Sequence, residues 1–449
     1  MAERKKISFS SKIGLIMAAA GSAVGLGNIW KFPYIAGENG GGAFLIVYLI
    51  CVALFGLPLI MTEFLIGKRS GKGAFGAFRT LNGNDRWQWL SWLCMLTAFI
   101  IMGFYFVVTG WCFNYLFEAL FNTFNHLDTA ALTAHFTTIS SNIPRMIGFS
   151  VLPVVLTAIV LWFDVNKGIE RLSKILMPLL LLMMILMAGR VLMLDGSNIG
   201  MRFFFQTDFT KITPKVIMEA MGQCFFSLSI GMGALITYGA YMPKTQNVTR
   251  TSIEVIILDT LVAVLAGVII FPAVFAFGFN PAEGPQLVFV VLPAIFGQMS
   301  FSWFSSVLFF ALLCIAALTS TISLMEVAVA FICEASETFS EKNSHLKPLK
   351  RHQSVLIVSA LVIVLIIACV VLPYLFDWFD EVTSCVMMPL GALGMSLFVG
   401  WSLPKNGEKG VLQADKGIKR WFGKLFIAVL RWLVPAAIIV IFLNSLGVL

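Results

Sequence analysis

The chain has 449 residues, of which 59% are hydrophobic and 12% are charged, and its formal net charge is +8 at pH 7. Soluble globular domains contain about 25% charged residues, so this composition excludes that class and favours a polytopic membrane protein. The positive charge alone would suit a nucleic-acid-binding protein, but the basic residues are distributed as membrane topology requires, and no nucleic-acid partner is expected.

Eleven apolar stretches are long enough to cross a bilayer as helices, since a hydrocarbon core of ~30 Å needs about 20 helical residues. They cover residues 13–33, 43–66, 87–121, 146–163, 175–194, 216–241, 253–279, 301–333, 355–376, 379–403 and 425–448. A further apolar run, Leu287 to Leu292 between Pro285 and Pro293, is too short to cross. We expect it to form a re-entrant hairpin or an outer lid.

Most basic residues fall on one side of this predicted topology. Of the 31 lysines and arginines, 24 lie in the N-terminal segment or in loops on that side. The other side carries Arg145, Arg190, Arg202, Lys211 and Lys215. Because cytoplasmic loops are enriched in Lys and Arg, we expect a cytoplasmic N-terminus and an external C-terminus. The protein is expected to be a multi-pass protein of the cell (inner) membrane.

Cysteine and histidine give no sign of a disulfide scaffold or a metal centre. The eight cysteines lie in or beside apolar stretches without a CxxC pair, and the four histidines lie in loops. Disulfide frameworks and zinc or haem sites depend on clustered residues of these types. We therefore expect neither.

Two of the apolar stretches are interrupted by small residues, the first at 21–28 and the sixth at 227–233. Backbone that leaves the helix at membrane depth persists only where it lines a cavity or holds a ligand. Paired breaks in the two halves of a chain are typical of transporters built from inverted repeats. We expect an all-α protein with one transporter domain, 1–449, containing five-helix repeats at 13–194 and 213–403 and an additional helix at 425–448.

The glycines of the first break indicate how it would bind a ligand. Gly21, Gly25 and Gly27 would permit backbone dihedrals that other residues avoid, and would allow close approach to a ligand. Freed carbonyls can then hold a cation, while the half-helix that resumes near Asn28 directs its positive end at an anion. A helix-packing role for Gly21 and Gly25 is the alternative.

Several motifs resemble those of the neurotransmitter:sodium symporter family. They are GSAVGLGNIWKFPY from Gly21, ENGGGAF from Glu38, GQCFFSLS from Gly222 and ALTS from Ala317. The resemblance runs colinearly from about residue 9 to 403, and eleven helices are typical of the bacterial amino-acid transporter branch. It implies a sodium-coupled symporter that works by alternating access, and not an enzyme.

The resemblance implies two sodium sites with oxygen ligands, which a hard cation requires. One would comprise three carbonyls and two adjacent hydroxyls, those of Gly21, Val24, Ala316, Thr319 and Ser320. The other would comprise Ala23, the Asn28 side chain, Ser227 and Asp259, and the carboxylate of the substrate would complete it.

The resemblance also implies an α-amino-acid site. Its carboxylate ligands would be Tyr105 and the N–H groups around Gly25 to Gly27, and its ammonium ligands Ala23, Phe226, Ser227 and Ser229. The uncharged side-chain pocket would be formed by Ile101, Phe226, Met232, Ser320 and Leu324. Monoamine carriers of the family have an aspartate at the position of Gly25. Its absence favours a substrate with its own carboxylate, and the flexible Met232 would admit a hydrophobic or aromatic side chain.

Asp259 departs from the pattern of the family, which commonly has Asn here and, in chloride-dependent members, Ser at the position of Ala263. An ionisable group within a span is costly and indicates function by default. Its carboxylate would supply the negative charge that chloride provides elsewhere. We therefore expect chloride-independent transport, with proton antiport through Asp259 left open.

Charged residues would close the site on both sides. The expected outer gate comprises Lys31, Gln223 and Asp380, and the inner gate Lys6, Tyr241 and Glu334. The family usually has Arg in place of Lys31, and because lysine lacks the bidentate geometry of arginine, we expect this outer gate to be looser. Among the other acids within spans, Glu63 is expected to bind the backbone of the second break, and Glu326 has no assigned role beyond that of a candidate proton site.

Two other functions fit the same sequence. One is a sodium-coupled carrier of a small osmolyte or a GABA-like substrate, and the other is a non-transporting amino-acid sensor or channel. The composition leaves the oligomeric state, the sodium stoichiometry and the identity of the amino acid open.

Overall fold

The computed structural model describes residues 8–83, 85–125, 127–282, 284, 287–342, 347–403 and 420–445. Within these residues all regular elements are helices, as the predicted fold class requires. Nine helices there are long and apolar enough to cross a membrane, and α1 and the helix after it form a broken span bent by 48°. With the broken pair α11 and α12 described below, the described residues contain the eleven predicted spans.

The first five spans are built as follows. The first contains α1 (Lys12–Ala23), η1 (Gly27–Lys31) and α2 (Phe32–Glu38), and the second α3 (Gly42–Cys51), η2 (Val52–Gly56) and α4 (Leu57–Ser70). After α5 (Ala74–Asn82) and η3 (Asp85–Trp87), the third is α6 (Gln88–Leu120). After α7 (Thr129–Ser141), the fourth is α8 (Ile143–Trp162), and the fifth joins η4 (Asn166–Glu170) to α9 (Arg171–Leu192).

The remaining spans follow α10 (Ser197–Phe205) and η5 (Phe209–Lys211). The sixth is α11 (Pro214–Ser227) with α12 (Ala234–Ala240), and the seventh α13 (Val248–Ala276). Then come η6 (Leu287–Val291), α14 (Leu292–Gln298), and the eighth and ninth spans, α15 (Ser302–Lys342) and α16 (Arg351–Val371). The tenth contains α17 (Pro373–Val382), η7 (Thr383–Met387), α18 (Met388–Leu397) and η8 (Phe398–Ser402), and the last α20 (Arg420–Ala428), η9 (Val429–Leu433) and α21 (Val434–Ser445).

Prolines explain most of the irregular turns inside the spans. The π-helical turns η1, η2, η6, η7 and η9 each end two residues before a proline, the last of these being Pro435. Proline has no N–H and its ring clashes with the carbonyl four residues earlier, so the preceding turn loosens. The helices that contain these turns, including the η6–α14 segment that does not cross, therefore continue past the prolines.

Side-chain caps set several helix starts. The N–H of Gly14 donates to the Ser11 hydroxyl over 3.0 Å, and the N–H of Arg250 donates to Asn247 Oδ1 over 2.7 Å. Each cap satisfies one of the N–H groups that the first turn of a helix leaves without a partner, and each contributes about 1 kcal/mol.

The eighth span is longer than its hydrophobic pattern predicts. The apolar stretch ends near residue 333, but α15 continues to Lys342. Hydropathy marks where a helix leaves the bilayer and not where its hydrogen bonding ends, and this extension carries Glu334, which contacts the segment around α5.

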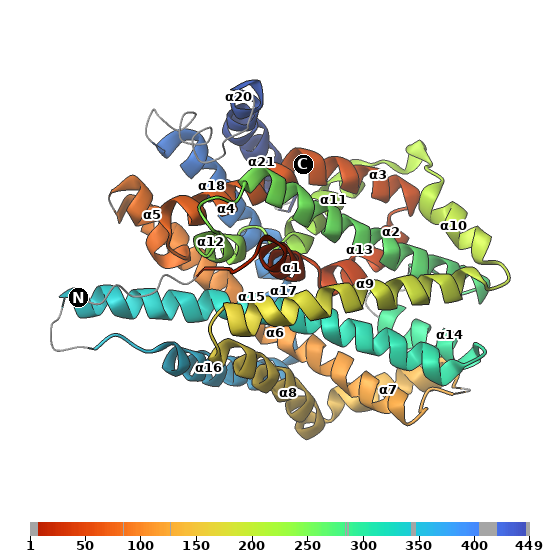
Figure 1. Cartoon of the computed structure of the whole chain (residues 1–449). Helices are drawn as coiled ribbons and strands as arrows, with labels where there is room; N and C mark the ends of the chain where they lie inside the picture. Colours follow the sequence, from red (N-terminus) through yellow and green to blue (C-terminus); the bar gives the residue numbers. More distant parts are fainter. Residues whose placement is uncertain are drawn as a thin grey trace.

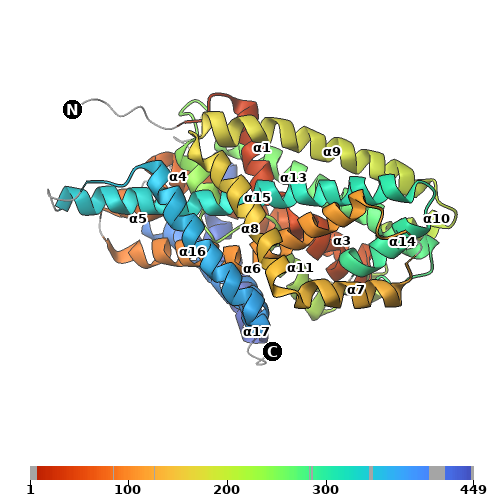
Figure 2. The same ribbon diagram turned by 90° about the horizontal axis from the view of Figure 1, so that it is seen from below.

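The two ends of the bundle differ in the elements that cover them. In both views α5 lies toward one end, and α7, α10 and α14 lie toward the other (Figure 1, Figure 2). We call these the α5 end and the lid end. At the lid end the predicted re-entrant segment is present as η6 and α14, and its residues 287–297 are buried. The centre of the Phe289 ring lies 5.6 Å from that of Trp111 and 5.4 Å from that of Tyr115. This segment therefore packs into the lid end of the bundle and does not cross it.

Candidate ligand and cation site

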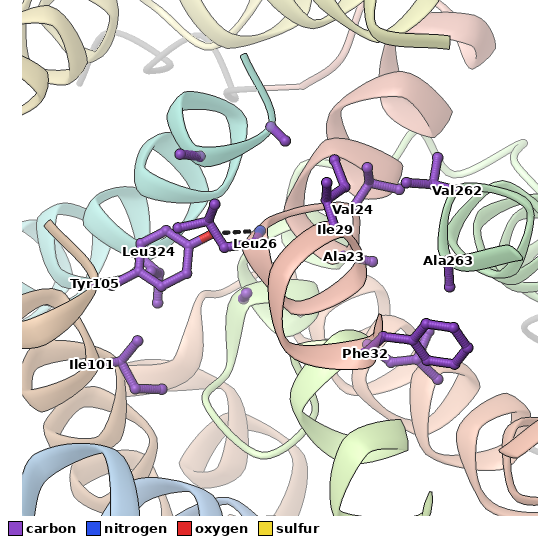
Figure 3. Packing of buried hydrophobic residues seen from close by; sticks show 14 of the residues in the cluster. Ala23, Val24, Leu26, Ile29, Phe32, Ile101, Tyr105, Val262, Ala263 and Leu324 are labelled. Carbon is purple, nitrogen blue, oxygen red and sulfur yellow. Dashed lines mark hydrogen bonds between the residues drawn. The ribbon is translucent and has the colours of Figure 1, made fainter. Parts of the chain in front are cut away.

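The first break lies between α1 and η1, where Val24 adopts an extended conformation. The N–H of Gly25 donates to Asn28 Oδ1 over 3.1 Å, and that of Leu26 donates to the Tyr105 hydroxyl over 3.1 Å. In a continuous helix those two N–H groups would bond to the carbonyls of Gly21 and Ser22. The break therefore frees carbonyl oxygens at membrane depth. Figure 3 shows Tyr105 facing Leu26 across this break.

The predicted reason for the glycines holds only in part. None of Gly21, Gly25 and Gly27 has a positive φ, so none is needed for a left-handed conformation. Close approach is the actual reason at Gly25, since a Cβ there would lie 2.2 Å from Ser320 Oγ and 2.8 Å from the Tyr105 hydroxyl. The break bends through ordinary dihedrals at Val24 instead.

The second break, between α11 and α12, does use left-handed backbone. Ser229, Gly231 and Gly233 have φ values of +54°, +94° and +77°. The N–H of Gly231 donates to Glu63 Oε1 over 2.8 Å, as the sequence predicts. A Cβ at Gly231 would lie 2.3 Å from the backbone oxygen of Met388, so this segment is packed directly against α18.

A small cavity of about 30 Å³ lies where the two breaks meet. Its described lining residues are Ser22, Ala23, Gly25, Gly27, Ile101, Tyr105, Phe226, Ser229, Met232, Ser320, Leu324 and Met388, and none of them is charged. Ten of the eleven predicted substrate residues are in this set, and Ser227 is not. In Figure 3 Ile101, Tyr105 and Leu324 lie on one side of the first break, and Val262 and Ala263 on the other.

Sequence reasoning missed two lining residues. Ser22 belongs to the glycine-rich motif itself, and a polar side chain beside a predicted break was a usable signal. Met388 lies on a distant span in an apolar run, so only the tertiary packing brings it to the cavity.

A polar cluster lies beside the cavity on the α13 side. The Asn28 amide donates to Asp259 Oδ1 over 2.8 Å and the Ser227 hydroxyl over 2.9 Å. Ser227 donates to both Asp259 oxygens over 3.1 Å. Tyr48, which the sequence analysis does not single out, donates to Asp259 Oδ2 over 3.4 Å. Asp259 is fully buried, so its side chain is exposed to neither solvent nor lipid.

Three of the four predicted protein ligands of this sodium site are thus brought together. Ala23 lines the adjacent cavity. The Asn28 oxygen, which the prediction assigns to the ion, accepts the N–H of Gly25 in this structure, and the amide nitrogen faces Asp259. The carboxylate is therefore the strongest cation-attracting group of the cluster.

The other predicted sodium ligands gather between α1 and α15. Ser320 donates to the carbonyl oxygen of Val24 over 3.3 Å, and Thr319 to that of Ala316 over 2.9 Å. A Cβ at Gly21 would lie 3.2 Å from the Thr319 Cβ. Two of the predicted carbonyls, those of Val24 and Ala316, are thus each bonded to one of the predicted hydroxyls, and Gly21 packs closely against Thr319.

Toward the lid end, the cavity is covered by a charged contact. Lys31 Nζ lies 3.2 Å from Asp380 Oδ1 and donates to the Ser384 hydroxyl over 3.3 Å. It also lies 4.3 Å from the centre of the Phe226 ring. Gln223 donates to the carbonyl of Gly27 over 2.7 Å, so it supports the first break rather than the charge pair.

Toward the α5 end the contacts differ from the predicted gate. Lys6 lies outside the described residues. Glu334 accepts the N–H groups of Gly73 and Gly76 over 2.5 and 3.0 Å. The Tyr241 hydroxyl donates over 2.8 Å to Glu326, the acid that had no assigned role.

Glu326 is fully buried, and the guanidinium of Arg351 meets it in a bidentate pair with distances of 2.9 and 2.6 Å. Arg351 also donates to the carbonyl of Leu161. This pair ties α15 to the start of α16 and the end of α8. Removing one partner of a buried charge pair of this kind strongly destabilises the protein, because the other charge is left buried without a partner.

The chain is similar to known transporters along its whole length. A model of the sodium:neurotransmitter symporter family matches residues 6–140 and 132–448. A Bacillus subtilis protein described as the uncharacterized sodium-dependent transporter YhdH is 37% identical, with all of both chains covered. A Haemophilus influenzae protein described as an uncharacterized sodium-dependent transporter is 33% identical, with 99% of both chains covered.

A solved structure is similar as well. The crystal structure of MhsT in complex with L-phenylalanine has a TM-score of 0.88 and 37% sequence identity to this chain, covering 98% of this chain and 100% of that one. The similarity therefore extends to all the spans that surround the cavity.

Proposed function

The chain belongs to the sodium:neurotransmitter symporter family, and from this premise we propose that it is a sodium-coupled symporter that imports a hydrophobic or aromatic amino acid by alternating access. Sodium-dependent transport is the activity of the family. The substrate, the ion sites and the gates are our proposal.

The uncharged cavity at the meeting point of the two breaks is the observation that carries the proposed substrate. One end presents the Tyr105 hydroxyl, which accepts the N–H of Leu26 and can itself donate to a carboxylate. The other walls are apolar, with Ile101, Phe226 and Met232 among them. A ligand with its own charges at one end and an apolar side chain at the other matches this division. The binding of L-phenylalanine by the similar protein MhsT supports the same class of ligand.

Two sodium ions would bind beside this cavity. One would lie at Asn28, Ser227 and Asp259 with the carboxylate of the substrate, and the other at the oxygens between α1 and α15. If the substrate completes the first ion shell, each ligand raises the affinity of the protein for the other, and this linkage is reciprocal.

Chloride-independent transport follows from the same cluster. Asp259 is fully buried and has hydrogen-bond donors but no cationic side chain among its described contacts. A carboxylate held in this way attracts a sodium ion without an accompanying anion. Ala263 has no hydroxyl with which to bind chloride.

In the transport cycle, the Lys31–Asp380 contact would close the outer side. The Tyr241–Glu326–Arg351 group, with Glu334, would close the inner side. This places the α5 end in the cytoplasm and the lid end outside, as the lysine and arginine distribution predicts. We further propose that the two five-helix repeats carry one broken helix each, and that the bacterial cell membrane is the site of function.

A thermal-shift screen of the purified protein against the twenty amino acids, GABA and glycine betaine tests the proposed substrate, because a ligand of the folded state raises its stability. We expect stabilisation by leucine, phenylalanine, tyrosine or tryptophan in sodium and none when potassium replaces sodium. Stabilisation by GABA or betaine alone would assign the osmolyte class.

Uptake into sealed proteoliposomes separates transport from sensing. We expect uptake that requires an inward sodium gradient and persists when gluconate replaces chloride on both sides. Sodium-dependent binding without uptake would assign a sensor, and strict chloride dependence would contradict the role proposed for Asp259.

A further inference from the structure

The Ser22 hydroxyl stands out among the groups that line the cavity. Ser22 is 2% exposed, and its Oγ has no hydrogen-bond partner among the described residues. It is the only lining residue of the described cavity with such a buried, unpartnered polar atom. An unpaired buried hydroxyl destabilises the unliganded site, so a group that pairs with it on binding would remove that destabilisation.

Other hydroxyls within the spans satisfy themselves locally. Thr62, Thr97 and Thr109 each donate over 2.7 Å to the carbonyl four residues earlier in the same helix. Serine and threonine in helices commonly bond back in this way. The Ser22 hydroxyl makes no such bond, although Ser22 lies in the last turn of α1 and is one of the residues that line the cavity.

Ser22 and the proposed carboxylate donor lie at opposite ends of the first break. Ser22 belongs to the last turn of α1, whereas the Tyr105 hydroxyl accepts the N–H of Leu26 at the far end of the break. The Ser22 carbonyl accepts the Ser229 hydroxyl over 2.9 Å, which puts Ser22 beside the break that carries Met232.

We propose that the Ser22 hydroxyl hydrogen-bonds to a polar atom on the side chain of the substrate. The preferred substrates are then amino acids whose apolar side chain carries an indole N–H or a phenolic O–H, in preference to those with a pure hydrocarbon side chain. This inference rests on the proposed function and names the substrate class within it.

The ammonium of the substrate is a poorer partner for this hydroxyl. Three carbonyls and the Ser229 hydroxyl are already proposed to accept its three N–H donors. A polar atom at the end of an aromatic ring reaches further from the charged groups, and it can satisfy Ser22 while the ring stays against the apolar walls.

The wild-type protein gives the first test. Tyrosine and phenylalanine differ by one hydroxyl, and tryptophan and 1-methyltryptophan by one N–H. In sodium, we expect about five- to tenfold tighter binding of tyrosine than phenylalanine and of tryptophan than its N-methyl analogue, measured by isothermal titration. Equal affinities within both pairs would overturn the inference, and binding of none of the four would instead count against the proposed function.

The S22A variant gives the second test. We expect the tyrosine-to-phenylalanine affinity ratio to fall by about fivefold. A uniform loss across all ligands would assign Ser22 to the charged end of the substrate and overturn the inference, as would an unchanged ratio. Sodium-dependent thermal stabilisation of S22A by any amino acid shows that the variant is folded.

Ser305 provides a matched control. It is fully buried on α15, its hydroxyl also has no partner among the described residues, and it does not line the cavity. S305A removes the same atoms from a similar environment, so the tyrosine-to-phenylalanine ratio should stay at the wild-type value. A ratio that falls equally in both variants would show that loss of a buried hydroxyl acts through the fold, and the inference would be wrong.

Discussion

The two helix breaks meet at the same cavity, but they are built in different ways. The first spans three residues, Val24 to Leu26, and bends without left-handed backbone. Its freed groups bond to side chains that come from other spans, namely Tyr105 and Ser320. The second spans six residues, 228–233, and depends on positive φ values and on backbone packed against α18.

This difference in construction indicates different roles for the two breaks in ligand binding and in maintaining the shape of the site. Side chains can rotate away from the first break when a ligand arrives, whereas backbone packed on backbone at the second break cannot yield without moving α18. We infer that the first break responds to ions and substrate, and that the second holds the site in place. Substitutions at the first break should therefore lower ligand affinity, whereas substitutions at the second break should lower the stability of the fold.

The largest expected effect is on the fold, from Gly231→Ala. The new Cβ would lie 2.3 Å from the Met388 backbone oxygen at a φ of +94°, so both clash and strain oppose folding. We expect several-fold lower yield of monodisperse protein and a clear drop in Tm. Gly222→Ala is the control, since a Cβ there meets nothing within 4 Å. Wild-type stability of the Gly231 variant would remove the distinction between the breaks.

The next largest effect is on binding, from Gly25→Ala. The atoms that its Cβ would meet most closely are side-chain oxygens, Ser320 Oγ and the Tyr105 hydroxyl, and not backbone, so the chain should fold with near-normal Tm. Displacing Tyr105 from the carboxylate and Ser320 from the side-chain pocket should weaken amino-acid binding by about 100-fold. Titration calorimetry in sodium measures this loss. A stable variant with wild-type affinity would show that the first break does not contact the ligand.

Glu63→Ala tests the support of the second break. The substitution leaves the buried N–H of Gly231 without its acceptor and should cost ~1–3 kcal/mol of stability. Glu63→Gln keeps an acceptor oxygen and should recover most of that loss. Thermal unfolding of the two variants measures the difference. If both lose substrate affinity but no stability, Glu63 belongs to the ligand site instead.

The smallest effect is expected from Lys31→Arg at the outer contact. A guanidinium can form two parallel hydrogen bonds with Asp380, where the lysine ammonium is a point charge. Because the pair is partly exposed, the gain should be about twofold in substrate residence time. Stopped-flow release of the bound amino acid measures it. Faster release than from the wild type would show that closure does not depend on this pair.

Much of this site was predictable because its residues lie in short motifs whose composition conflicts with a membrane helix. Glycines and serines inside an apolar span predict a break, and a lone carboxylate such as Asp259 predicts a polar partner. The structure places Asn28 and Ser227 against that carboxylate.

Pairings between distant spans were less predictable. Arg351 looks like an ordinary basic residue at a helix start, and only the packing of α16 on α15 makes it the partner of Glu326. Met388 lies in an apolar run, and its position at the cavity depends on its contact with Gly231. The conformational role predicted for Gly25 was wrong, because backbone angles depend on the bend as a whole and not on the residue type alone.

The central claim is that sodium and an amino acid share one site at the first break. Sodium binding to the purified protein, measured with and without saturating phenylalanine, tests it most directly. The shared site predicts that phenylalanine lowers the half-saturating sodium concentration by about tenfold, and that sodium lowers the Kd for phenylalanine by the same factor. Binding of both ligands with no effect of either on the other would contradict the claim.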